Sequence, residues 1–519
     1  MRKSKTLAAR RKPARRKPRR VAAALAIAAI LLAGAFLLAH MLVTRWLLSG
    51  PRLRAWINTS PETTLIEYDE AVSTVPGTLR LKNLRIRGSD ANVEWIVRLA
   101  EARAEYSILA LLSRTFRVQR VSGSGLTFRL RQKLDRRDAH HLPAAELPPI
   151  EGFSDPPWRK PEPEEPAAVD SGDPWTVEVG GIGIDRFEEI WLDGYHFEGS
   201  ARLRGAFRLR PGRLARVGPA DVDFASGTLR VAGHPLLDAV AGGIHAAIAP
   251  WDPRVVRGGA VWRNVDARID FHGPGGHLDF LNAFLRDSRE PRFEGGQGVF
   301  SAQGAIDRGK ASGRAHLASR GGRARLSGLQ LTGSARVSLR IPSWDLERGP
   351  VDLSGSALQL TDVAASGAAD SREWWARLDL PKARVRDGLE ADLKLECRDA
   401  RPLLAALGVG LPRWTRGLLT LEGLTAEAGV MLASARTRVR GLEARGGKFH
   451  ILGEYARDGG DEEGVFLLES GLLRVGVGAG GRASVRVFAP RRWYVKERAL
   501  LLSSQEDVDV DVESRARQP

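Results

Sequence analysis

The sequence predicts a mainly β protein in which one N-terminal transmembrane helix precedes a long antiparallel sheet and the other helices are few and short. Three observations predict this fold class. An unbroken apolar run extends from Val21 to Ala39. Beyond it, apolar side chains alternate with Arg, Lys or small polar residues in many stretches, which is the periodicity of half-buried strands. Regular strand-helix alternation is missing, which argues against a parallel sheet.

The first 43 residues have the charge and hydropathy of a membrane anchor. Residues 1–20 hold eleven basic and no acidic side chains, which predicts a cytoplasmic basic tail. The segment 21–43, interrupted only by His40, is long enough to cross a bilayer as a helix. The rest of the chain is then expected on the other side of an inner membrane, in the periplasm. The side chains expected to anchor it are Val21, Leu25, Ile30, Leu32, Phe36 and Leu38.

Three other interpretations explain this segment less well. Cleavage as a signal peptide beside Ala33-Gly34-Ala35 requires a shorter apolar region. A nucleic-acid-binding tail accounts for the basic residues but leaves the apolar run unexplained. A soluble buried helix without a polar face needs a large core on every side.

Charge and cysteine content exclude several functions for the rest of the chain. Removing the eleven charges of the tail from the formal +17 leaves +6, which is ordinary for a protein surface and gives no reason to expect a nucleic-acid partner. Cys397 is the single cysteine, so no internal disulfide can form. It lies in a strand-like stretch, where we expect a half-buried side chain.

The strands are expected in two regions, 45–135 and 175–500. The first is a strand-helix-strand unit whose helix is expected in 107–114, and the second is a strand-rich region with short helices expected in 277–287 and 400–408. Gly-containing turns separate the strands. The apolar side chains expected to line the inside of the second region are Leu203, Phe207, Leu209, Leu229 and Val231.

A proline-rich segment lies between the two regions. Nine prolines occur from Pro143 to Pro174, so residues 136–174 are expected to form a linker or a long exposed loop. At the other end, residues 501–519 form an acidic and polar tail. Asp507, Asp509 and Asp511 alternate with valines, which predicts a solvated edge strand there.

The apolar faces of so many strands must be hidden from water. They can pack as a sandwich, close as a barrel, or curl into a trough whose inside holds an apolar ligand. Alternation alone is compatible with all three, because each gives the same in-out pattern. Base rates favour an ordinary closed core.

The motifs do not indicate an enzyme, a metal site or a cofactor. Gly476, Gly478 and Gly481 fit the dinucleotide spacing, but a strand follows them where a phosphate site needs a helix. His140 and His141 are adjacent and lack the spacing of a helical metal site. We therefore expect no catalytic residue and no cofactor.

The order of parts resembles that of the AsmA-like envelope proteins. An N-terminal anchor precedes strand, helix and strand in "WIVRLAEARAEYSILALLSRTFRVQRVSGSGLTFRLR", with Leu111-Leu112 in the helix and a turn from Val121 to Leu126. A proline-rich gap and the meander that opens with "WTVEVGGIGID" follow. Residues 383–481 also resemble the C-terminal part of such a protein, with a strand, the segment "DARPLLAAL" and a further meander.

The resemblance implies a curled, groove-like sheet related to those of bridge-like lipid-transfer proteins. The expected partners are membrane lipids, handled as phospholipids or other acyl chains, together with an envelope protein, and not nucleic acid. A second hypothesis is an adaptor with closed β-domains that assists envelope protein assembly and carries no lipid. On the transport hypothesis, Asp at Leu209 or Leu229 blocks loading of a folded protein, whereas in a closed core it unfolds the protein.

Overall fold

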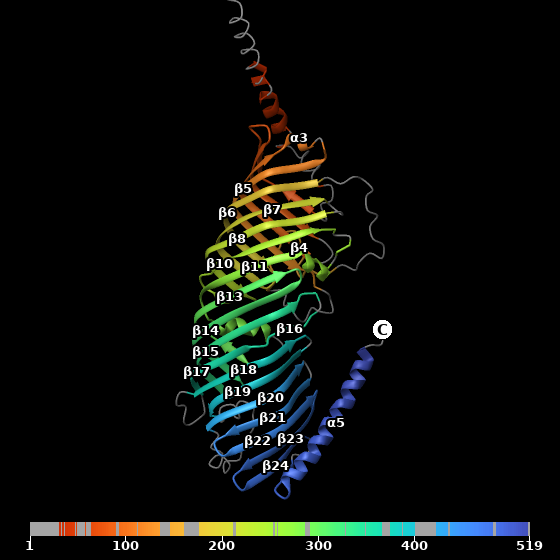
Figure 1. Ribbon diagram of the computed structural model, residues 1–519. Coiled ribbons are helices and arrows are strands. Elements are labelled where there is room, and N and C mark those ends of the chain that lie inside the picture. The colour runs from red at the N-terminus through yellow and green to blue at the C-terminus, as the bar shows by residue number, and fades with distance from the viewer. Residues whose placement is uncertain are drawn as a thin grey trace, which may run out of the picture.

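The computed structural model shows one large mixed sheet that curls along its length (Figure 1). The structure describes residues 31–46 except 33 and 36, 48, 58, 64–89, 93–134 except 112, 146–159, 176–210, 214–252, 255–256, 258–285, 291–326, 329–365 except 348, 374–399 except 387, 422–433, 436–480 and 484–516. Within these residues the sheet has 25 strands. The fold is therefore mainly β, as the alternating pattern predicts.

The strands follow one another along the molecule nearly in chain order. They are β1 (Thr64–Glu67), β2 (Glu70–Val72), β3 (Thr78–Ser89), β4 (Val93–Tyr106), β5 (Thr115–Gln132), β6 (Thr176–Leu192), β7 (Tyr195–Arg210), β8 (Leu214–Val231), β9 (His234–Leu237), β10 (Ala241–Trp251), β11 (Val265–Gly275), β12 (Arg292–Glu294), β13 (Gln297–Asp307), β14 (Lys310–Leu326), β15 (Leu329–Asp345), β16 (Val351–Asp352), β17 (Ser356–Ala365), β18 (Trp374–Val385), β19 (Gly388–Asp399), β20 (Glu422–Ala433), β21 (Arg436–Gly446), β22 (Phe449–Asp458), β23 (Asp461–Ser470), β24 (Leu473–Gly480) and β25 (Ser484–Arg486). Each short strand pairs with part of a long neighbouring strand. The short strands are β1, β2, β9, β12, β16 and β25.

One strand pair departs from the expected antiparallel arrangement. β5 and β6 run parallel, with Thr115 beside Thr176 and Leu130 beside Leu192. Parallel neighbours need a long crossover, because the chain must return to the starting end of the first strand. The proline-rich segment lies between these two strands in the sequence. It therefore connects hydrogen-bonded neighbours of one continuous sheet.

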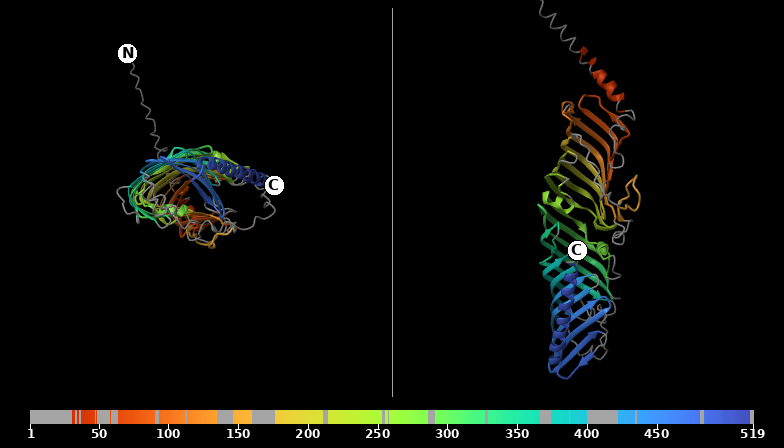
Figure 2. Two further views of the ribbon diagram at one scale, coloured as in Figure 1. Left: turned by 90° about the horizontal axis from the view of Figure 1, so that it is seen from below. Right: turned by 90° about the vertical axis from the view of Figure 1, so that its right-hand side faces the viewer.

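The curl gives the sheet an inward and an outward face, seen end-on in Figure 2. We call the face that carries Ile184, Leu203 and Val222 the inward face and the one that carries Arg204, Asp221 and His245 the outward face. Strand period two puts successive side chains on opposite faces. Many apolar residues of the strands consequently meet on the inward face.

Two separate clusters of buried side chains lie on the inward face. The first extends from β4 to β10 and includes Ile184, Ala201 and Leu237, each no more than 2% exposed. The second extends from β17 to β22 and includes Trp374 and Cys397. Between them, the 3-10 helix η3 (Leu278–Phe284) packs Phe280 against the first cluster.

The helices differ from the sequence expectations in length and place. The helix expected in 107–114 is the single turn α3 (Ile108–Leu111), and that in 277–287 is the 3-10 helix η3. A further 3-10 helix, η2 (Gly258–Asn264), precedes β11. The helix expected in 400–408 lies outside the described residues.

The C-terminal segment contradicts the expected edge strand. The helix α5 (Pro490–Ala516) contains Asp507, Asp509 and Asp511. Its first turns pack Tyr494 against β23, and a helix that is anchored in this way extends at little cost, because only nucleation is unfavourable. Local alternation of Asp and Val was therefore overridden by tertiary packing of the preceding residues.

The expected membrane segment, 21–43, lies partly outside the described residues, including Val21, Leu25, Ile30 and Phe36. Its described residues from 31 onward are helical, and Leu32 and Leu38 are exposed. The helix meets the sheet where the His40 ring approaches the Ser73 hydroxyl at 3.2 Å. In the described part of the chain, no helix is both long and apolar enough to cross a membrane.

Candidate functional site

The candidate site is the inward face of the sheet, which carries continuous apolar rows. Strand register aligns the first row across β6, β7, β8, β10, β11, β13, β14 and β15. Its members are Ile184, Leu203, Val222, Ile244, Ile269, Gly304, Gly313 and Ile341. A second row continues from β14 to β24 as Leu317, Val337, Leu358, Leu378, Leu395, Ala426, Ala444, Ile451, Leu468 and Val475. Together the rows extend along most of the molecule.

The middle of the inward face is apolar without being closed. In the described parts of β11, β13 and β14 the inward positions hold only Gly, Ala, Ser, Val, Ile, Leu and Phe. Ile269, Ile306, Leu339 and Ile341 are only half-buried. Half-buried apolar side chains in a continuous row leave apolar surface in contact with water, which is a feature of interaction sites.

Small residues leave space above the sheet on the inward face of this middle section. Gly304 and Gly313 lie directly opposite each other on β13 and β14, and Ala302 pairs with Ala315 beside them. Because glycine and alanine have little or no side chain, this part of the face is thinner than the packed cluster around Ile184. Side chains therefore fill the inward face less in this section than in the cluster around Ile184.

The five side chains predicted to line the inside all lie on the inward face, in β7 and β8. Leu203 and Leu229 are half-buried and pack against the first cluster, and Val231 is a buried member of it. Phe207 is half-buried between Val179 and Val217. Leu209 is exposed, so it lies at the margin of the face. The half-exposed residues of β11 to β15 were missed because burial does not follow from alternation.

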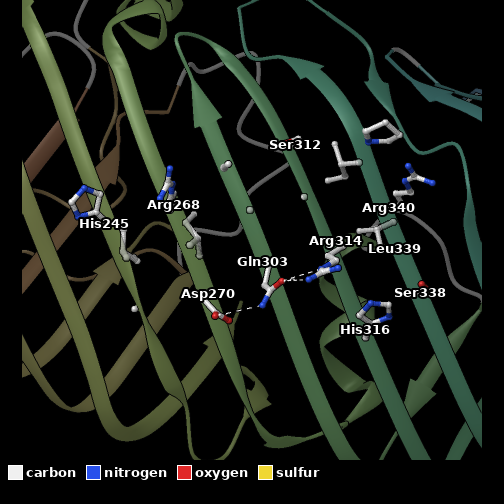
Figure 3. Close-up of a pocket in the computed structure, with 18 of the residues that line it drawn as sticks. His245, Arg268, Asp270, Gln303, Ser312, Arg314, His316, Ser338, Leu339 and Arg340 are labelled. Carbon is white, nitrogen blue, oxygen red and sulfur yellow. Dashed lines mark hydrogen bonds between the residues drawn. The ribbon is translucent and has the colours of Figure 1, made fainter.

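A hollow of about 960 Å³ lies over β8 to β15 (Figure 3). Polar side chains at outward positions line it, and its lining also includes Ile269, Leu339 and Ile341 from inward positions. The Arg314 guanidinium donates to the Gln303 side chain at 2.9 Å, and the Gln303 amide approaches Asp270 at 3.5 Å. His245 pairs with Asp221 on the neighbouring strands. The hollow is open, and its charges are mixed in sign.

Within the described residues, no group of three or more His, Cys, Asp or Glu side chains is placed to hold a metal ion. Cys397 is buried on the inward face, and this burial raises the pKa of its thiol to about 11. A thiol that stays protonated at neutral pH is a poor nucleophile. Cys397 therefore contributes packing.

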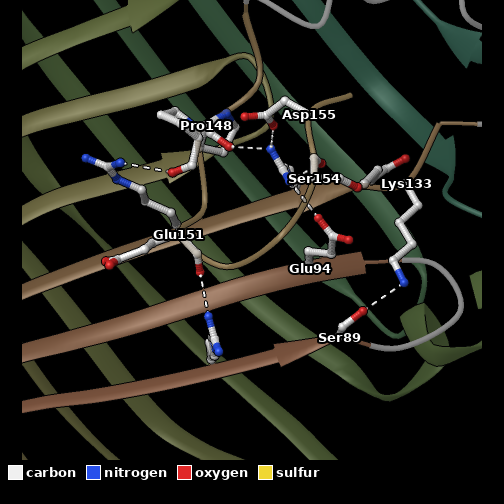
Figure 4. Close-up of polar contacts among 12 residues, drawn as sticks. Ser89, Glu94, Lys133, Pro148, Glu151, Ser154 and Asp155 are labelled. Carbon is white, nitrogen blue, oxygen red and sulfur yellow. Dashed lines mark hydrogen bonds and ion pairs between the residues drawn. The ribbon is translucent and has the colours of Figure 1, made fainter. Parts of the chain in front are cut away.

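Residues 146–159, which we call the proline strap, cover the outward face of β3 to β5 (Figure 4). Arg131 on β5 is 1% exposed and pairs with Glu94 on β4 at 2.8 Å. It also pairs with Asp155 and donates to the Pro148 carbonyl at 3.2 Å. The strap thus supplies acceptors for a buried cation and fixes the crossover against the sheet.

The helix α5 covers the outward face at the opposite end of the sheet. Trp493 and Tyr494 pack with Leu452, Val465 and Leu467 of β22 and β23. Burial raises the pKa of the Tyr494 phenol. Because these strand residues alternate with Ile451 and Leu468, α5 leaves the inward rows uncovered.

Comparison with protein families, with curated proteins and with solved structures finds no match to this chain. The functional argument consequently depends on the geometry of the inward face.

Proposed function

We propose that this protein is an inner-membrane-anchored envelope protein whose periplasmic sheet binds lipid and conducts it along the inward face. The observation that carries the proposal is the pair of overlapping apolar rows, from β6 to β15 and from β14 to β24, which are half-exposed between the two packed clusters. Acyl chains match such a surface, because they are extended, apolar and in need of shielding from water.

The polar surroundings support the same assignment. Beside the inward row, the outward positions of β11 and β14 carry Asp266, Arg268, Asp270, Arg314 and Arg320. The outward face is therefore suited to water while the inward face is not. The basic tail and the apolar segment 21–43 give the proposed orientation, with the sheet on the periplasmic side.

An adaptor without lipid remains the second candidate, and a specific observation favours it. In the first cluster Ala201 and Leu237 are completely buried, which is the burial of an ordinary closed core. If the whole inward face closed in this way, the protein would present only its polar outer surface to partners. The middle section between the clusters decides between the two functions.

Native mass spectrometry of the gently purified full chain, followed by lipid extraction, tests the proposal. We expect bound phospholipid in the wild-type protein and its loss in Leu339→Asp, with the fold retained. The matched control is Arg336→Asp, which places the same residue on the outward face of the same strand. A lipid-free wild-type protein, or a Leu339→Asp variant that unfolds, supports the closed adaptor instead.

A further inference from the structure

The end of the molecule farthest from the N-terminal helix carries exposed apolar side chains. β24, β25 and the first turns of α5 form this end (Figure 1; Figure 2). Leu472 in the turn between β23 and β24 is fully exposed, and Phe488 after β25 is 94% exposed. Leu473, Val485 and Val487 are also exposed. We call these five residues the distal tip.

Strand register brings the two parts of the distal tip together. β25 pairs antiparallel with β24, with Gly476 beside Arg486 and Val477 beside Val485. Continued in the same direction, this register carries Val487 toward Val475 and Phe488 toward Arg474, next to Leu473. The apolar residues are therefore gathered at one edge of the sheet.

Basic side chains surround the distal tip. Arg474, Arg486, Arg491, Arg492 and Lys496 are exposed within or beside the same segments. The nearby Glu469 is engaged by Arg491 at 2.6 Å and by Arg474 at 3.3 Å. The surroundings of the apolar residues are thus cationic, which favours an anionic partner.

We propose that the distal tip docks on an anionic phospholipid surface, with Leu472 and Phe488 entering the interface and the basic side chains contacting headgroups. This combination of apolar insertion and basic attraction is how peripheral segments bind anionic membranes. The inference rests on the proposed lipid function, since it gives the inward face a membrane at its far end.

A protein partner that extends the sheet fits this end less well. Strand addition needs a free sheet edge with several backbone groups to pair. β25 is three residues long, and Pro490 begins α5 four residues after it. A short edge that ends in proline offers few backbone hydrogen bonds.

The test places an environment-sensitive fluorophore on Phe488→Cys in the full chain, held in neutral phosphatidylcholine nanodiscs. The native Cys397 is buried with a raised thiol pKa, so maleimide labelling is expected at residue 488. The control is Val299→Cys, an exposed apolar position on the outward face of β13. Vesicles with or without phosphatidylglycerol are then added.

We expect a blue shift and a several-fold rise in emission at residue 488 with phosphatidylglycerol vesicles, and no change at residue 299. Reversal of Arg486 and Arg492 to Glu should abolish the signal, and added salt should weaken it. No response at residue 488, or an equal response with neutral vesicles, overturns the proposal. A response only to an envelope protein fraction overturns it in favour of a protein partner.

Bound lipid measured on the same samples separates this inference from the proposed function. If charge reversal removes vesicle docking while phospholipid still copurifies, docking and loading are distinct and both proposals stand. If the reporter responds but the protein never contains lipid, docking stands without lipid transport.

Discussion

At the residue scale, Arg131 shows how the outward face tolerates a buried charge. Its guanidinium is surrounded by the Glu94 carboxylate, the Asp155 carboxylate and two carbonyls of the proline strap. A buried ion needs such complete pairing, because removing it from water costs several kcal/mol. Arg131 is therefore the buried contact that holds the strap, beside the more exposed contacts of Arg87, Arg98 and Arg129.

We predict that Arg131→Met destabilises the protein by about 3–5 kcal/mol, because Glu94 is left buried without its partner. Arg98→Met removes the exposed pair with Glu151 and should cost no more than about 1 kcal/mol. Chemical denaturation of both variants gives the comparison. Equal losses would show that Arg131 does not hold the strap.

Glu454 is the corresponding buried group beneath α5. Its carboxylate is 1% exposed and accepts from Arg498 at 2.7 Å and from the Gly441 amide at 2.9 Å. Gly441 lies at an irregularity between Val439 and Leu442 of β21, where the strand register shifts. Glu454 thus joins this irregular strand to the helix.

For this group we expect Arg498→Met to cost about 1–3 kcal/mol, since the carboxylate stays buried with one fewer partner. The control on the same helix is Arg491→Met, whose pair with Glu469 is more exposed and should be worth no more than about 1 kcal/mol. Unfolding free energies from urea titration decide the matter. A larger loss in the control would contradict the role given to Glu454.

At the element scale, the positions of the strands were predictable from sequence. Which strands pair with one another was predictable only in part. Alternation in the stretch that contains Leu203, Phe207 and Leu209 identified β7 and its inward face. It could not reveal that β6 pairs parallel with β5. Parallel pairing depends on the path of the connecting segment, and no repeating sequence pattern reports that path. The strap was missed for the same reason, since Arg131 alternates like any exposed arginine.

The helix α5 was missed because its cause is distant in the sequence. An added Cβ on Gly476 would lie 2.4 Å from the Trp493 ring, so the strand provides space for the indole. In the sequence, Gly476 and Gly478 had matched only the spacing of a dinucleotide site, which the following strand excluded. Their packing role could be inferred only once β24 and α5 were known to be adjacent.

Gly476→Ala should accordingly displace Trp493 and destabilise the α5 contact by about 1–3 kcal/mol. Gly460→Ala is the control, because nothing lies within 4 Å of its added methyl group. Thermal unfolding and protease cleavage near α5 report the change. Identical behaviour of the two variants would mean that the indole is not packed on β24.

The α5 contact should also weaken in acid. The Arg491 hydrogen bond holds the pKa of Glu469 below its ordinary value of 4.5. A carboxylate with a lowered pKa stabilises the fold above the ordinary value and loses this effect as the pH falls through the folded value. The stability difference between wild type and Glu469→Gln should therefore be fully present at neutral pH and be lost as the pH falls below the ordinary value of 4.5 and through the lowered folded pKa. If the stability difference persists in acid, the ionised Glu469 carboxylate is not its cause.

At the scale of the whole molecule, the sheet is long. About twenty successive long strands at ~4.8 Å spacing give a length of roughly 90 Å. The N-terminal helix lies at one end and the distal tip at the other (Figure 1). Sequence could suggest this length and the inward apolar face, but not the two packed clusters, because clustering depends on which strands curl toward each other.

The central claim is that lipid lies against the inward face between these clusters. Photocrosslinking along β15 tests it most directly, with benzoylphenylalanine placed in turn at Val337, Ser338, Leu339, Arg340 and Ile341 of the membrane-extracted full chain. We predict lipid adducts at Val337, Leu339 and Ile341, whose side chains face inward, and none at Ser338 or Arg340, which face outward. Adducts without this alternation, or no adducts at any position, would contradict the account.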